Sequence, residues 1–86
     1  MQTFLVEHYR PGLSAEDLRH AAGVIRAAAQ TLEGEGSTVH YVASTIVPAD
    51  EAFMSVFEAE SEEDVREAYA RAGAQFERIS AAVAAD

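Results

Sequence analysis

Two periods of apolar residues run along this chain, one typical of strands and one typical of helices. Runs rich in β-branched and aromatic residues predict strands, and apolar residues at helical spacing predict amphipathic helices. We predict strands over residues 3–9, 38–47, 52–59 and 76–83. We predict one helix over residues 15–33, with a stripe from Leu18 to Leu32, and a shorter helix with Val65, Ala68, Tyr69 and Ala72 on its buried face.

Local signals mark where these elements begin and end. Ser14 and Ser61 are each followed three residues later by an aspartate, which is the pattern of a capping box at a helix start. Gly34 and Gly36 end the first helix and Gly73 ends the second, and residues 48–51 form a hairpin turn. The resulting order, βαββαβ, predicts an α+β, ferredoxin-like fold as a single domain over residues 1–86. Right-handed connections give a four-stranded antiparallel sheet in the order 4-1-3-2, with two helices on one face.

The hairpin register predicts which side chains face the helices. With the turn at residues 48–51, Ser44 lies opposite Ser55 and Val42 lies opposite Phe57, on the helix side. The other, open face then carries Leu5, Glu7, Tyr9, Tyr41, Ala43, Thr45, Met54, Val56, Glu58, Arg78 and Ser80. That face is too apolar to be left in water, so we expect a second copy to cover it, as in dimeric α+β barrels.

Composition excludes several classes of function. The 86 residues include six Arg, no Lys and fifteen Asp plus Glu, which gives a formal net charge of −9. Such a surface repels phosphate, so nucleic acid and anionic membranes are not expected partners. The absence of Cys excludes disulfides, thiolate metal sites and a cysteine nucleophile. No apolar run reaches the roughly 20 residues of a membrane span and no signal-peptide pattern is present, so we expect a cytoplasmic protein.

Four stretches resemble a small bacterial family of unknown function: FLVE at 4–7, the run from Ser44 to Glu51, FEAESEEDVREA at 57–68, and the run from Arg71 to Ile79. The family comprises ferredoxin-like homodimers and includes a nickel-binding protein. The resemblance covers nearly the whole chain. It implies the fold, the dimer, and nickel or another divalent transition metal as cofactor, with no ligand assigned residue by residue. No organic cofactor is evident in the sequence.

Ionisable groups on the apolar open face are the candidate ligand-binding residues. In a 4-1-3-2 sheet Arg78 lies near Glu7. Either Arg78 and burial set the pKa of a Glu7 carboxylate that acts on a ligand, or the two form an ion pair that only orders the sheet. Tyr41 and Glu58 are expected to be cross-strand partners, either touching a ligand or satisfying each other at the dimer edge.

Histidines are the candidate metal ligands. His8 and His40 lie at opposite edges of the sheet, on the helix side, and His20 lies on the outer side of the first helix. Three imidazoles so separated form no triad within one chain, so they are either separate surface or edge residues or ligands of a surface or inter-subunit site.

Three functions therefore compete. The first is a homodimer that binds a divalent transition metal or a small ligand. The second is a small dimeric α+β-barrel enzyme, an isomerase, cyclase or cofactorless oxygenase, with a cavity lined by Glu7, Tyr41 and Glu58. The third is a purely structural or regulatory dimerisation module. Fold alone does not choose among them.

Overall fold

A computed structural model describes residues 1–83 and 85 of the chain. Its elements are β1 (Gln2–Tyr9), α1 (Ala15–Gly34), β2 (His40–Val47), the 3₁₀ turn η1 (Pro48–Asp50), β3 (Ala52–Ala59), α2 (Glu62–Ala72) and β4 (Arg78–Ala82). The sheet is antiparallel in the order β2-β3-β1-β4, which is the predicted order 4-1-3-2. The ferredoxin-like fold is confirmed.

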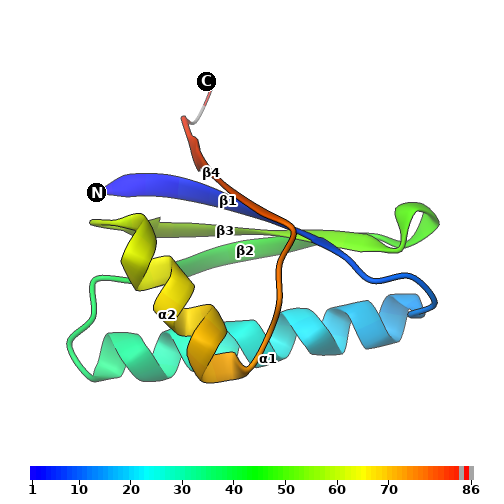
Figure 1. Ribbon diagram of the computed structural model, residues 1–86, viewed down its shortest axis with the longest axis horizontal. Coiled ribbons are helices and arrows are strands. Elements are labelled where there is room, and N and C mark those ends of the chain that lie inside the picture. The colour runs from blue at the N-terminus through cyan, green and yellow to red at the C-terminus, as the bar shows by residue number, and fades with distance from the viewer. Residues whose placement is uncertain (84, 86) are drawn as a thin grey trace.

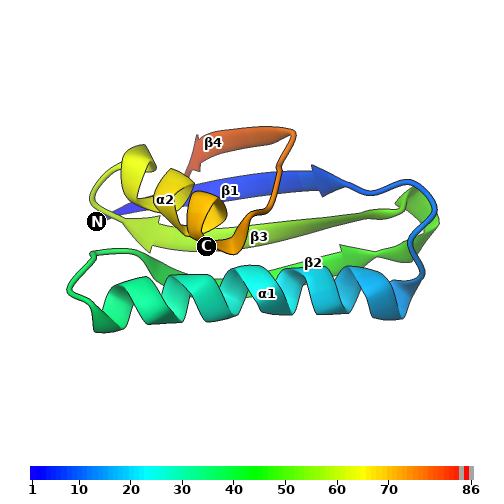
Figure 2. The same ribbon diagram turned by 60° about the horizontal axis from the view of Figure 1, so that its bottom comes forward.

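Both helices lie on one face of the sheet, and no described element covers the other face (Figure 1). Figure 2 shows α1 lying along β2, while α2 crosses the β1 and β3 side. The core fills the space between the helices and the sheet, with Val6, Leu18, Phe53, Phe57 and Val65 all fully buried. The alternation in β1 is as predicted, since Phe4, Val6 and His8 point into this core.

The two predicted capping boxes behave differently. At the start of α1, the Ser14 hydroxyl accepts a hydrogen bond from the backbone N–H of Asp17 at 3.1 Å. At the start of α2, Ser61 makes no side-chain capping bond. The end of α2 follows prediction, because Gly73 adopts a left-handed φ of 66° that suits glycine.

The last strand is shorter than the predicted range 76–83. It begins only at Arg78, and Val83 lies beyond its end, 94% exposed, instead of facing the helices. Phe76 belongs to the preceding connection, where its ring packs edge-on against Tyr69 with centroids 5.0 Å apart. This aromatic contact with α2 holds Phe76 away from the sheet.

A β-bulge in β2 changes the predicted faces of that strand. The register matches the prediction from Val47 back to Ala43, which pairs with Val56, but Tyr41 rather than Val42 pairs with Phe57. Val42 is the extra residue and is 48% exposed. Because of this insertion, Tyr41 lies on the helix side, where its ring meets Phe57 edge-on at 5.6 Å.

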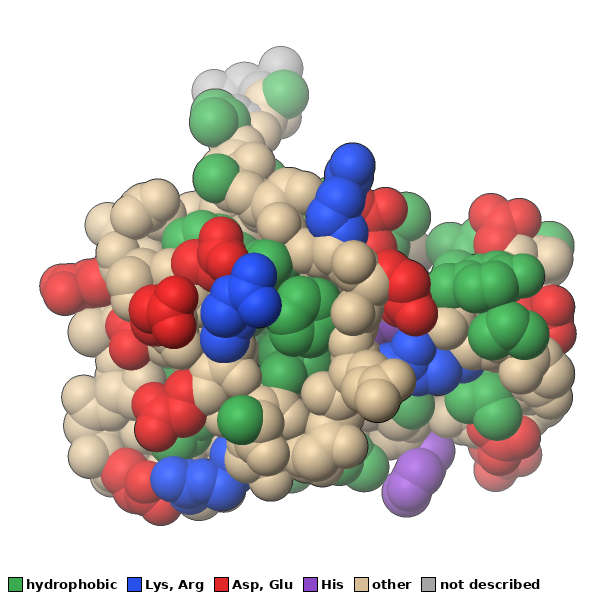
Figure 3. Space-filling model, viewed as in Figure 1, with side chains coloured by type: hydrophobic (Ala, Val, Ile, Leu, Met, Phe, Trp, Pro, Cys, Tyr) green, Lys and Arg blue, Asp and Glu red, His purple; other side chains and the backbone are tan. Residues whose placement is uncertain are grey.

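Acidic side chains are spread over the face that carries α2, with arginines among them (Figure 3). No helix within the described residues is long and apolar enough to cross a membrane.

Candidate functional site

Glu7 and Arg78 meet on the open face as predicted. They are directly opposite in the β1–β4 register, and Arg78 Nε donates to Glu7 Oε2 at 2.7 Å. The Arg78 side chain is 71% exposed and that of Glu7 is 34% exposed. Water therefore screens the pair, and its geometry is that of a cross-strand ion pair on a half-wet surface.

Tyr41 and Glu58 are not partners, so this prediction is wrong. The bulge at Val42 places His40, not Tyr41, opposite Glu58. The Tyr41 hydroxyl instead donates to Ser44 Oγ at 2.6 Å, on the helix side of the sheet. The predicted cavity lined by Glu7, Tyr41 and Glu58 is therefore not assembled, because the tyrosine and the two carboxylates lie on opposite faces.

The open face keeps the apolar centre that the register predicts. Leu5 and Ala43 flank Val56 on neighbouring strands, and Met54 lies in the next row between Thr45 and Glu7. Leu5 and Val56 are only half-buried, and Met54 is 38% exposed. A continuous apolar strip thus crosses three strands of the uncovered face.

The three histidines lie in three separate environments. His20 is exposed on α1, and His40 is exposed at the start of β2 with Nδ1 3.1 Å from a Glu33 carboxylate oxygen. His8 is only 2% exposed, so the expectation of a surface or edge residue is wrong for it. Within residues 1–83 and 85, no three His, Asp or Glu side chains are grouped so that they could hold a metal ion.

His8 takes part in a buried contact that sequence reasoning missed. Its Nδ1 lies 3.0 Å from the Phe53 carbonyl oxygen and its Nε2 lies 2.7 Å from the Tyr69 hydroxyl. The imidazole also stacks on the Phe53 ring with centroids 3.9 Å apart. Burial lowers the pKa of His8 from 6.5 to about 4, and burial raises the pKa of the Tyr69 hydroxyl above its usual value.

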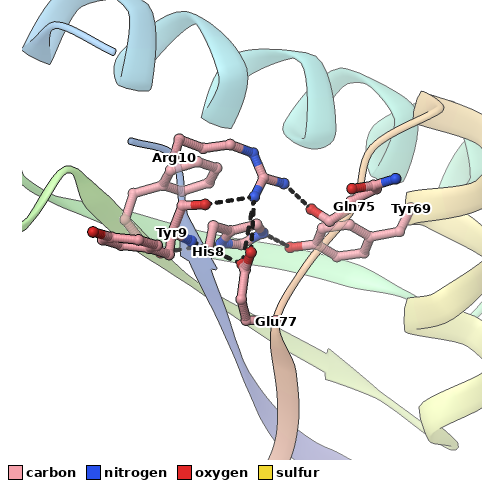
Figure 4. A network of polar contacts seen from close by, with 7 residues as sticks. His8, Tyr9, Arg10, Tyr69, Gln75 and Glu77 are labelled. Carbon is pink, nitrogen blue, oxygen red and sulfur yellow. Dashed lines mark hydrogen bonds and ion pairs between the residues drawn. The ribbon is translucent and has the colours of Figure 1, made fainter. Parts of the chain in front are cut away.

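Beside this contact, Arg10 ties the end of β1 to the connection before β4 (Figure 4). Its guanidinium donates to the Tyr9 carbonyl at 2.9 Å, to the Gln75 carbonyl, and to the Glu77 carboxylate at 3.3 Å. Glu77 also accepts from the Tyr9 backbone N–H at 2.8 Å. Each of these partners accepts a hydrogen bond from the Arg10 guanidinium, so the cluster holds two chain segments together.

A hollow of about 540 Å³ lies next to this cluster, between α1, the end of α2 and the connection that follows it. Its walls are mostly apolar and include Val24, Ile25 and Phe53.

The alternation of β1 and the stripe of the second helix point His8 and Tyr69 into one core. Those two signals could have suggested the contact, but no local pattern indicated the Arg10 cluster or the hollow.

The comparison with protein families identifies the chain. A family model described as "Nickel responsive protein SCO4226-like" matches residues 4–81. The chain belongs to the SCO4226-like family. The predicted relationship to a small family that includes a nickel-responsive protein is thereby confirmed.

A solved structure supports the SCO4226-like fold over the whole chain. The crystal structure of SCO4226 from Streptomyces coelicolor A3(2) superposes with a TM-score of 0.75 and 21% sequence identity, covering 98% of this chain and 99% of that one. At this identity the likeness shows the fold alone. No curated protein sequence matches this member of the SCO4226-like family.

Proposed function

We propose that this protein binds nickel or a similar divalent transition metal as a homodimer. The observation that carries the proposal is the exposed pair of His40 and Glu33, in a chain that belongs to a family described as nickel-responsive. Imidazole nitrogen and carboxylate oxygen are ligands that suit such ions.

The surroundings of this pair favour a cation. Glu33 lies in the last turn of α1, which contains no basic residue. The carbonyl groups at a helix C-terminus carry a partial negative charge, and Glu33 adds a full one. The neighbouring Glu35 accepts from both terminal nitrogens of Arg71, which also holds the pKa of that carboxyl below its usual value, so Glu35 is already occupied.

One chain supplies only part of a metal shell at this position. His40 and Glu33 give two ligands, whereas a transition-metal site takes four or more. His8 is not available without loss of its two hydrogen bonds in the core. Water or a second copy would complete the shell, and a site with so few protein ligands binds modestly.

The uncovered sheet face supports the homodimer. Its apolar strip of Leu5, Ala43, Met54 and Val56 is what two copies would bury by packing sheet to sheet. The ion pair of Glu7 and Arg78 borders the strip and would lie at the rim of such an interface. The sheet of a second copy is the simplest cover for this strip, because a two-fold axis brings the same strip of both copies face to face.

Calorimetry with nickel chloride on the untagged protein tests the metal. Wild type should bind, His40→Ala should lose at least tenfold in affinity, and Glu33→Gln should show a smaller loss. His20→Ala is the matched control, since it removes another exposed imidazole from α1 and should leave the affinity unchanged. No heat with wild type, or equal binding by wild type and His40→Ala, would refute the proposed site.

A further inference from the structure

Two of the six arginines stand apart from the others. Arg10, Arg66, Arg71 and Arg78 each form an ion pair with a glutamate. Arg19 and Arg26 form no hydrogen bond or ion pair with any residue among 1–83 and 85. In a chain with fifteen acids and a net charge of −9, two unopposed guanidinium groups are unexpected.

Both of these arginines line one cleft. It has a volume of about 350 Å³ and lies between α1 and β2, which run side by side in Figure 2. The remaining lining side chains come from the same two elements, and of the described residues that line it none is acidic: Ala22, Gly23, Tyr41, Ser44 and Ile46. A volume of this size lies at the lower end of the range for small-molecule sites.

The helix period explains how the arginines come together. Positions 19, 23 and 26 are spaced by four and three residues, so their side chains share one face of α1. Gly23 lies between the two arginines, and a Cβ built on it meets no atom within 4 Å. Packing therefore does not require glycine here. Its missing side chain leaves open space on the helix face between the two arginine positions, at a site where glycine weakens the helix.

The wall contributed by β2 carries the hydroxyl groups of Tyr41 and Ser44. Tyr41 Oη donates to Ser44 Oγ at 2.6 Å, and Ser44 Oγ lies 2.7 Å from the Oγ of the fully buried Ser55. This row of hydroxyls runs from the cleft into the core. It anchors the tyrosine whose position depends on the bulge at Val42. The aliphatic side chains of Ala22 and Ile46 complete the lining.

We propose that the cleft between α1 and β2 binds a small organic anion, whose carboxylate or phosphate group is held by Arg19 and Arg26 and whose body lies against Ile46 and Tyr41. Guanidinium groups recognise both oxyanions through paired N–H donors. The cleft is on the helix side, away from the uncovered sheet face, and does not involve His40 or Glu33. The proposal is therefore independent of the metal site and of the dimer.

Titration of the ¹⁵N-labelled protein tests this site. Benzoate and phenyl phosphate serve as probes for the two head groups, and neutral benzamide has the same ring without the charge. Saturable amide shifts around Gly23, Tyr41 and Ser44 are expected with at least one anion and not with benzamide. No saturable shift with either anion, shifts centred elsewhere, or equal shifts with benzamide would overturn the proposal.

Matched variants distinguish specific binding in the cleft from a general attraction of anions to arginine side chains. Arg19→Gln and Arg26→Gln should each weaken binding about tenfold. Arg66→Gln removes the same charge from α2, far along the chain from the cleft, and should leave the affinity unchanged. Gly23→Leu keeps both arginines but fills the space between them, and should abolish saturable binding. An equal loss in Arg66→Gln, or unaltered binding by Gly23→Leu, would contradict a site in this cleft.

Discussion

The Nε2 atom of His8 lies 2.7 Å from the hydroxyl oxygen of Tyr69, a contact between residues 61 positions apart in the sequence. The tautomer follows from the other ring nitrogen. Nδ1 faces the carbonyl oxygen of Phe53, which can only accept, so Nδ1 carries the proton and donates. Nε2 is then the bare nitrogen, and Tyr69 donates its hydroxyl proton to it. A second proton on the imidazole would reverse this contact, since Nε2–H would then donate to the Tyr69 oxygen and the hydroxyl proton would need another acceptor.

Stability should fall as pH is lowered from about 6.5 to about 4. Burial lowers the pKa of His8 to about 4, whereas the unfolded chain keeps a value near 6.5. Between these values the unfolded state takes up a proton that the native state does not bind. The free energy of unfolding therefore decreases by up to about 3 kcal/mol through this window, and the contribution of His8 levels off below it. Urea unfolding at pH 7, 6, 5 and 4 measures this change.

The control for this pH dependence is His8→Gln, which cannot titrate. The variant should be less stable at pH 7 by about 1–3 kcal/mol, because the paired groups of Phe53 and Tyr69 lose their geometry in the core. Its stability should also change less than that of wild type between pH 6.5 and 4. Parallel curves for the two proteins would show that His8 does not titrate in this window.

The two helix-start serines should differ when each is replaced by alanine. Ser14→Ala removes the hydrogen bond to the N–H of Asp17 and should lower the free energy of unfolding by about 1 kcal/mol. Ser61→Ala removes no capping bond and should lower the free energy of unfolding by only a few tenths of a kcal/mol. Thermal unfolding of both variants measures the difference, and equal losses would contradict the observed capping.

Sedimentation at micromolar concentration should show about twice the mass of one chain, because the apolar strip on the open face requires a cover. Val56→Asp places an uncompensated charge in the middle of that strip and should give a monomer. Val24→Asp is the control, since Val24 is 40% exposed on α1 and lies on the opposite side of the molecule. A wild-type monomer, or dissociation by both variants alike, would refute dimerisation through this face.

The ion pair of Glu7 and Arg78 should contribute little to the stability of a single chain. A double-mutant cycle with Glu7→Gln and Arg78→Gln should give a coupling free energy of about 0.2–1 kcal/mol, because water screens both side chains. High salt should reduce it further. A coupling well above this range would indicate that the pair is desolvated, as it would be under a covering partner.

The chain by itself determined the features that depend on local periodicity. The stripe from Leu18 to Leu32 and the cap at Ser14 defined α1, and the alternation in β1 assigned Phe4, Val6 and Glu7 to their correct faces. The pairing of Glu7 with Arg78 followed from strand order alone. Period, capping and right-handed connections are properties of short segments, so they can be read before any tertiary contact is known.

Tertiary structure decided the features that depend on contacts across the fold. The bulge at Val42 brings Tyr41 to the helix side, where the tyrosine packs on Phe57 and donates to Ser44. The pairing of His8 with Tyr69 and the cleft that gathers Arg19 and Arg26 over β2 are likewise non-local. Each follows from how α1, α2 and the sheet pack together. Such packing depends on which residues are neighbours in space, and the spacing of residues along the sequence does not indicate those neighbours.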